Sequence, residues 1–182
     1  NICQIIEKLY DVKASKYKDL NGRVFTNRGS YAYLKIADGC SNACSYCTIP
    51  RIKGRYRSFE MNDLVKEAKY LADQGVKELV LVAQDITRYG EDLYGKNCLI
   101  DLLKKLAKID QIKWIRLHYL YPEKTSDELL DYIEKEPKIC KYIDIPLQHI
   151  DNRILKEMRR RLGENQTRNL ITKLKTKYHN IY

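Results

Sequence analysis

The segment Tyr31–Thr48, which reads YAYLKIADGCSNACSYCT, decides the fold class of this chain. Its first part, residues 31–37, predicts a β-strand, and three cysteines follow within eight residues. A cysteine cluster directly after a strand is held in place by that strand. The elements predicted after this segment indicate which fold presents the cysteines.

Strands and helices alternate along the rest of the chain. An apolar stripe at helical spacing predicts a helix over residues 61–72, closed by Gly75. Residues 77–83 are nearly continuously apolar, as is typical of a buried parallel strand. Thr125 and Glu128 have the spacing of a capping box at the start of a later helix. The other predicted elements are a helix over 99–106, strands over 112–117 and 139–145, and helices over 154–158 and 170–174.

Four strand-then-helix units with short connections predict an α/β fold with a parallel sheet and right-handed crossovers. The periodicity fits either a flat doubly wound sheet or an open barrel. A complete α/β barrel usually needs about 200 residues or more, whereas this chain has 182. A barrel would therefore be partial, truncated before its last strands, with one more strand starting at Ile181 and Tyr182.

The N-terminal part of the chain is predicted to lie outside this core. Apolar residues at helical spacing up to Leu9 predict the end of a helix. The polar stretch after it, with a turn signal at Asn21-Gly22, predicts a linker. Residues 1–25 are therefore interpreted as the end of a preceding domain and a linker, and residues 26–182 as an incomplete core domain.

Three of the six cysteines form a C-x₃-C-x₂-C run, namely Cys40, Cys44 and Cys47. Iron–sulfur cubanes are held by thiolates supplied over short spacings, because their irons lie close together. Three local thiolates would leave one iron without a protein ligand and open to a substrate. Gly39 allows the backbone to turn sharply into this loop.

Other metal sites fit the cysteine run less well. A structural zinc site needs four ligands, often two C-x₂-C pairs, and the second pair is missing here. His118 and His149 are isolated, and a ferredoxin-like cluster would need a fourth cysteine with its own local spacing. The remaining cysteines are interpreted as ordinary thiols on apolar faces, and these are Cys3, Cys98 and Cys140.

With Tyr46 before its last cysteine, the C-x₃-C-x-aromatic-C pattern after the first strand resembles the radical S-adenosylmethionine (SAM) superfamily. The resemblance implies a partial TIM-like barrel and a 4Fe-4S cluster on Cys40, Cys44 and Cys47. It also implies that SAM chelates the open iron through its amino and carboxylate groups. One electron from the cluster would then split the sulfonium, and the resulting 5′-deoxyadenosyl radical would remove a hydrogen from an unactivated C–H bond.

Longer segments resemble the methylthiotransferases, and within them the RimO type, which modifies an aspartate of the small-subunit ribosomal protein S12. The alternative is the MiaB type, which acts on isopentenyl-adenosine in transfer RNA. That type typically shows GQN after the second strand, S-H-P after the third and L-P-V-Q-S-G after the fourth. At the corresponding places this chain has Ala83-Gln84-Asp85, Leu120-Tyr121-Pro122 and Ile145-Pro146-Leu147-Gln148-His149. The resemblance covers about residues 31–161 and favours the protein-modifying type.

The same resemblance implies roles for single residues. Tyr46 corresponds to an aromatic residue that lines the adenine pocket, although plain packing explains it equally well. Gln84 and Asp85 occupy the place where the superfamily contacts the methionine amino group. Arg160 would meet the SAM carboxylate, since guanidinium groups suit carboxylates, but the neighbouring arginines leave this assignment ambiguous. His149 would either touch substrate or serve as a hydrogen-bonding scaffold residue.

The positions of the polar motifs relative to the predicted strands support one common site. In parallel α/β folds, ligands collect beyond the carboxyl ends of the strands. Four polar motifs follow predicted strands, at Cys40, Gln84-Asp85, Tyr119 and Gln148-His149. They are therefore expected to converge on one rim.

The family also implies parts that this sequence lacks. These are a second 4Fe-4S cluster on three cysteines of an N-terminal domain, which is implicated in sulfur delivery, and a C-terminal TRAM domain. Cys3 lies too close to Cys40 in sequence to belong to such a trio. We expect that these 182 residues alone cannot complete methylthiolation. The implied partners are the small ribosomal subunit and an electron donor such as flavodoxin or ferredoxin.

The composition predicts a globular protein, and the cysteine usage predicts a cytoplasmic one. Hydrophobic residues make up 44% and charged residues 32%, which argues against wholesale disorder. No run of about 18 apolar residues predicts a membrane span. No export signal is recognisable, and the cysteine distribution does not resemble a disulfide framework, which indicates a reducing compartment.

The net charge of +10 is unevenly distributed. Residues 151–177 carry nine basic residues against three acidic ones, and a second basic run follows the cysteines, with Arg51, Lys53, Arg55 and Arg57. Such patches suit a nucleic acid, a ribonucleoprotein or an anionic cofactor, and a plain solvated surface is the alternative. A third function therefore stays open, a non-enzymatic metal-binding module that docks RNA.

Overall fold

The computed structural model describes residue 9 and residues 29–182 of the chain. Apart from Leu9, the predicted N-terminal helix end lies outside the described residues. Cys3 and the predicted boundary between residues 25 and 26 lie outside them as well.

The described part of the chain is built around a parallel sheet with the strand order β1-β4-β5. Its strands are β1 (Tyr31–Lys35), β4 (Glu78–Val82) and β5 (Trp114–Leu117). Leu34, Leu81 and Leu117 are register partners across the three strands, and each is completely buried. The predicted α/β class with a parallel sheet is confirmed, because each of these strands is followed by a helix before the next one begins.

Three crossover helices cover the sheet, namely α3 (Met61–Asp73), α4 (Leu99–Ala107) and α5 (Asp127–Lys135). Each buries one apolar face at helical spacing; in α4 that face comprises Leu99, Leu102, Leu103 and Leu106. After α3, Gly75 adopts a φ of +94° and turns the chain toward β4. Among the described helices, none combines the length and apolar character needed to cross a bilayer.

A small insertion between β1 and α3 is not predicted by the sequence. It comprises β2 (Ala37–Asp38), α2 (Ile49–Ile52) and β3 (Arg57–Ser58), and β2 pairs with β3 in antiparallel orientation. The cysteines lie within it, on the segment that connects β2 to α2. These elements are too short to leave a periodic signal in the sequence.

The predicted strand over residues 139–145 is wrong. Only Ile139 forms a β-bridge, to Ile115, and the residues after it belong to no strand. On the side away from β5, these residues form two backbone hydrogen bonds with the end of the chain. Ile143 N–H donates to Tyr182 O at 2.8 Å, and Tyr182 N–H donates to Lys141 O at 2.9 Å. Leu120 N–H also donates to Asp144 O at 2.9 Å. A strand needs a continuous neighbour, and a single bridge with these scattered bonds does not supply one.

The predicted cap at Thr125 is wrong by one residue. Ser126 is the N-cap of α5, and its Oγ accepts a hydrogen bond from Leu129 N–H at 3.2 Å. The Thr125 hydroxyl instead donates to Tyr121 O at 3.0 Å, within the turn formed by η2 (Pro122–Lys124). Both residues are good caps, so the local turn decides between them.

The C-terminal helices are longer than the sequence predicts and start earlier. They are α6 (Asn152–Glu157) and α7 (Glu164–Thr176). The Asp151 carboxylate caps α6 by accepting hydrogen bonds from Arg153 N–H at 2.8 Å and Ile154 N–H at 3.1 Å.

Candidate functional site

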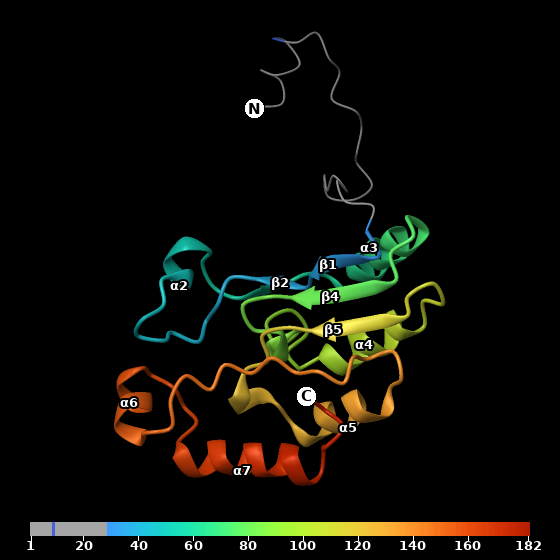
Figure 1. The fold of residues 1–182 in the computed structure, drawn as a ribbon. Coiled ribbons are helices and arrows are strands. Elements are labelled where there is room, and N and C mark those ends of the chain that lie inside the picture. Colours follow the sequence, from blue (N-terminus) through green and yellow to red (C-terminus); the bar gives the residue numbers. More distant parts are fainter. Residues whose placement is uncertain (1–8, 10–28) are drawn as a thin grey trace.

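The carboxyl ends of β1, β4 and β5 point to one side of the molecule, where α2 and α6 also lie (Figure 1). This edge, called here the rim, is where ligands collect in parallel α/β folds. The cysteine loop, residues 39–48, leaves β2 on this side. The segments that follow β4 and β5 contact the cysteine loop here, through Asp85 and Tyr121.

Backbone contacts hold the cysteine loop in place. Cys40 N–H donates to Gly54 O at 3.2 Å, and Ser45 N–H donates to Met158 O at 3.2 Å. Gly39 has a φ of +72°, and a Cβ atom there would lie 2.3 Å from Arg55 O. The loop therefore needs glycine at this position both for its conformation and for the close approach of residues 54–55.

Replacing Gly39 with alanine is expected to destabilise the loop by about 2–4 kcal/mol, because a left-handed conformation and a backbone clash add together. The expected result is weak retention of iron after anaerobic reconstitution, together with a lower midpoint of thermal unfolding. Gly95→Ala is the matched control, since Gly95 also has positive φ, at +70°, but has open space around its Cα. Equal iron retention in the two variants would contradict the steric argument.

Polar hydrogens surround the cysteine sulfurs, which are half-buried. The Tyr121 hydroxyl lies 3.3 Å from Cys44 Sγ, and Arg160 Nη1 lies 3.9 Å from the same sulfur. Asn42 N–H donates to Cys40 Sγ at 3.5 Å. Hydrogen bonds of this kind stabilise anionic sulfur and tune iron–sulfur clusters.

The three cysteines lie on one short loop, as the local ligands of a cubane must. Burial raises the pKa of the Cys40 thiol, the hydrogen bond from Asn42 N–H opposes that increase, and the nearby Asp85 carboxylate adds to it, so bound cations would stabilise its thiolate. Within residues 29–182, no three His, Cys, Asp or Glu side chains are arranged around a point that could hold one metal ion. Cluster thiolates each bind a different iron and need not converge on one point.

Asp85 ties the cysteine loop to the end of β4. Its carboxylate is fully buried and accepts hydrogen bonds from Asn42 Nδ2 at 3.0 Å and from Thr87 N–H at 3.0 Å. Arg88 Nη1 donates to the other end of the Asn42 amide at 3.3 Å. Burial raises the pKa of Asp85, and the hydrogen bonds from Thr87 and Asn42 oppose that increase. In this structure Asp85 therefore positions Asn42, which stands between two of the cysteines.

Gln84 has a buried acceptor with no partner. Its side-chain oxygen is buried, and it accepts no hydrogen bond from any described residue. Such a group is costly unless something donates to it. An amino group that reached this oxygen would supply that donor, and the role of Gln84 at the amino end of an amino-acid ligand stays a prediction.

Arg160 differs from the arginines on either side of it. Its side chain is only 3% exposed, whereas Arg159 and Arg161 are exposed. The guanidinium stacks on the Tyr121 ring at 4.0 Å and donates to Pro146 O at 2.9 Å. Of the three arginines, Arg160 alone lies beside Cys44.

Tyr46 and His149 are exposed, unlike Arg160. Tyr46 is 51% exposed, so its ring is open to a ligand or to solvent. His149 is exposed, and its Nδ1 accepts a hydrogen bond from Asp151 N–H at 2.9 Å. That bond favours the scaffold interpretation of His149.

Three residues at the site are missed by the sequence-based interpretation. Asn42 bridges to Asp85, and Tyr121 bridges Cys44 and Arg160. Glu123 Oε1 accepts from the backbone N–H groups of residues 161 and 162, and Glu123 Oε2 lies 4.0 Å from Arg160 Nη2. Only the position of Tyr121, shortly after a predicted strand, is a signal that could have indicated one of them.

Strained backbone is concentrated near the rim. Among the described residues, four non-glycine residues have positive φ, and they are Ala43, Tyr119, Gln148 and Arg159. Ala43 lies between cysteines, Tyr119 and Gln148 lie in the predicted rim motifs, and Arg159 directly precedes Arg160. Such conformations cost about 1–3 kcal/mol each and cluster at functional sites.

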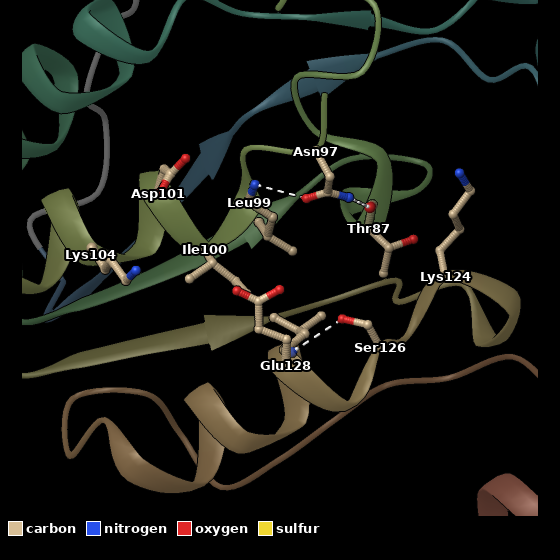
Figure 2. Close-up of a pocket in the computed structure, with 10 residues that line it drawn as sticks. Thr87, Asn97, Leu99, Ile100, Asp101, Lys104, Lys124, Ser126 and Glu128 are labelled. Carbon is tan, nitrogen blue, oxygen red and sulfur yellow. Dashed lines mark hydrogen bonds between the residues drawn. The ribbon is translucent and has the colours of Figure 1, made fainter. Parts of the chain in front are cut away.

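A cavity of about 230 Å³ lies between the first turns of α4 and α5. Figure 2 shows Asn97 at one edge of the cavity, with its amide donating to Thr87 O and accepting from Leu99 N–H. No cysteine lines this cavity. The charged residues that line the cavity balance one another, and they are Lys104, Lys124, Asp101 and Glu128. The cavity therefore shows no preference for a charged ligand.

Comparison with known proteins agrees with this geometry. The family model "Radical SAM superfamily" matches residues 34–181. The chain is 48% identical over 188 residues to "Ribosomal protein uS12 methylthiotransferase RimO" of Lachnoclostridium phytofermentans, a match that covers 99% of this chain and 43% of the relative. The protein of the same name from Aquifex aeolicus is 50% identical over 158 residues, covering 87% of this chain and 37% of the relative. The chain thus spans less than half of the length of these relatives.

Solved structures show the same fold at low identity. A radical S-adenosylmethionine methyltransferase, TsrM, from Kitasatospora setae, with tryptophan and a SAM analogue bound, superposes with a TM-score of 0.60 at 18% identity and covers 81% of this chain and 29% of that one. The same enzyme with cobalamin and a [4Fe-4S] cluster gives a TM-score of 0.60 at 17% identity, over 80% of this chain and 28% of that one. Because the family model spans most of the chain and the parallel α/β fold carries a three-cysteine loop at its rim, this chain belongs to the radical SAM superfamily.

Proposed function

We propose that this chain is the core of a radical SAM methylthiotransferase of the RimO type, which acts on an aspartate of ribosomal protein uS12. The observation that carries the proposal is the cysteine loop at the rim, which polar groups from three other segments contact: Asp85 accepts from Asn42, and Tyr121 and Arg160 lie beside Cys44 Sγ. The curated relatives with this activity in their name support the reaction and the substrate.

In this proposal Cys40, Cys44 and Cys47 hold a 4Fe-4S cluster. When bound, the cluster supplies one electron for reductive cleavage of SAM. The chain's own residues position the ligands and exclude water: Asn42 and Asp85 fix the cysteine loop, and the stacked pair Tyr121–Arg160 closes the side next to Cys44.

The SAM ligand would be oriented by complementary polar groups. The free acceptor of Gln84 would take a hydrogen bond from the methionine amino group. Arg160 would face the carboxylate, because a guanidinium fork is a strong partner for that group. Tyr46, which is half-exposed on the cysteine loop, would cover the adenine. Asp85 would act on the amino group through the position of its neighbour Gln84, since its own carboxylate is already hydrogen-bonded.

The proposal extends to parts beyond these residues. Residues 26–182 would be the core domain, preceded by a linker and a domain that carries the second 4Fe-4S cluster. A ribosomal substrate would place the enzyme in the cytoplasm. The electron would come from a carrier protein such as flavodoxin or ferredoxin.

The proposal is tested with the full-length protein after anaerobic reconstitution. We expect about four irons from the rim cluster, in addition to any held elsewhere, and release of 5′-deoxyadenosine when dithionite and SAM are added. Incubation with small ribosomal subunits should add a methylthio group to uS12, detected as a mass increase of one peptide. Subunits whose target aspartate is replaced by asparagine are the matched control and should stay unmodified.

Two outcomes would contradict the proposal. Methylthio groups in bulk transfer RNA, with uS12 unmodified, would support the MiaB type instead. Bound zinc with no cleavage of SAM would support the non-enzymatic metal-binding module.

A further inference from the structure

The basic hairpin, residues 48–57, is attached directly to the cysteine loop. It begins at the residue after Cys47, contains α2, and returns to contact the start of the loop. There Gly54 O accepts from Cys40 N–H at 3.2 Å, and Tyr56 N–H donates to Ser41 Oγ at 3.2 Å. Figure 1 shows α2 standing out from the sheet at the end where the strands terminate. The hairpin is therefore an outer wall of the cluster site.

The hairpin presents positive charge with little compensation. No acidic residue occurs between Asp38 and Glu60 in the sequence. Lys53 pairs with Asp38 at 3.3 Å, but within residues 29–182 the exposed residues Arg51, Arg55 and Arg57 form no ion pair. Among them lies Ile52, which is 72% exposed.

We propose that the basic hairpin is the docking surface for an acidic one-electron carrier protein that reduces the cluster. This inference rests on the proposed function, because it requires a redox-active cluster on Cys40, Cys44 and Cys47. One electron leaves the carrier, which is oxidised, and enters the cluster, which is reduced by one electron; no bond forms or breaks and no atom is exchanged in this step. The carrier supplies the electron that SAM cleavage then consumes.

Three features favour a protein carrier over RNA. The patch is small, as suits the weak and transient encounters of redox partners, which bury less than about 1,200 Å². It combines arginine with an exposed aliphatic residue, Ile52, a combination that suits protein interfaces. Single-stranded RNA is instead held by aromatic stacking, and isoleucine cannot stack on a base. The hairpin is also the wall of the cluster site, so a partner bound there reaches the group that it must reduce.

The test uses the reconstituted full-length enzyme and a reduced flavodoxin of net negative charge as the probe. Arg51→Glu/Arg55→Glu reverses two charges of the hairpin. The matched control, Lys69→Glu/Lys105→Glu, makes the same change in net charge on the exposed surfaces of α3 and α4. For each variant, 5′-deoxyadenosine formation is measured once with flavodoxin and once with dithionite, and the affinity for oxidised flavodoxin is measured by titration at several salt concentrations.

We expect the hairpin variant to lose about tenfold or more of its flavodoxin-driven rate and affinity, and to keep its dithionite-driven rate. The control should match the wild type in both assays. The variant Arg51→Ser/Arg55→Ser removes the two positive charges without adding negative ones, so it should give an intermediate loss. It serves as a second variant if the charge-reversal variant is poorly folded. The wild-type affinity should fall as salt increases.

Several results would overturn the docking proposal. The first is that the hairpin variant keeps the wild-type rate with flavodoxin, and the second is that the control variant loses as much of that rate as the hairpin variant does. The third is that the hairpin variant also loses its rate with dithionite, which would mean that the arginines serve the cluster itself. Weaker binding of small ribosomal subunits with unchanged flavodoxin affinity would overturn it in favour of RNA. If the wild type cleaves no SAM with dithionite, the proposed function fails, and the titration still decides whether the hairpin binds the carrier.

Discussion

Replacing Cys44 with alanine is expected to abolish the iron–sulfur absorbance of the rim cluster and to lower 5′-deoxyadenosine formation by at least about 10³-fold. The cluster would keep only two protein thiolates, and the sulfur that Tyr121 and Arg160 approach would be missing. Visible absorbance, acid-labile sulfide and iron per chain measure cluster content. The rate of SAM cleavage with dithionite measures activity.

Cys98→Ala is the matched control for this loss. Cys98 is buried at the start of α4, and its Sγ donates only a weak hydrogen bond to Lys96 O at 3.5 Å. Its replacement removes a thiol of the same kind but leaves the cysteine loop untouched. If Cys44→Ala retained the full rim cluster, or if both variants lost it equally, Cys44 would not be a ligand.

Replacing Arg160 with alanine is expected to lower kcat/KM for SAM cleavage by about 10- to 100-fold, the usual effect of removing a hydrogen-bonded charged partner. Most of the loss should fall on KM if Arg160 binds the SAM carboxylate. Arg160→Lys should recover little, because an ammonium group cannot both stack on Tyr121 and hold two acceptors in a plane. The assay measures initial rates over a range of SAM concentrations, with iron content determined in parallel.

The neighbouring arginines provide matched controls for Arg160. Arg159→Ala and Arg161→Ala each remove one positive charge from the same segment, but both side chains are exposed, so their effects should stay below about threefold. Equal losses in all three variants would mean that net charge, rather than the position of Arg160, supports the reaction. Loss of iron in Arg160→Ala alone would show a role in holding the cluster.

The parts of the fold with strong periodicity are predictable from the sequence. The crossover helices α3 and α4 lie within one residue of their predicted bounds, since each buries a regular apolar face. The insertion between β1 and α3 is not predictable, because its strands are two residues long and are stabilised by pairing with each other. The segment 139–145 resembles a strand in its apolar residues, but strand formation depends on neighbours that local sequence does not reveal.

The candidate site is predictable in its chemistry but less so in its contacts. The spacing of the cysteines and the position of polar motifs after strands indicate one rim, and the hydrogen bond between Asn42 and Asp85 joins two of those motifs. The sequence cannot distinguish Arg160 from its neighbours, because burial depends on how the segment after α6 turns. The contacts of Asn42 and Tyr121 are likewise visible only in three dimensions, since each residue contacts a side chain that is far away in the chain.

The two hydrogen bonds from Ser45 to the end of α6 couple the cysteine loop to the C-terminal part of the chain. Ser45 N–H donates to Met158 O at 3.2 Å, and Ser45 Oγ donates to Glu157 O at 2.8 Å. Any ligand that orders the loop therefore also stabilises the end of α6, and by thermodynamic reciprocity a partner that grips α6 stabilises the loop. Loading of a cluster on the loop and binding of a partner at α6 would in this way stabilise the same two contacts.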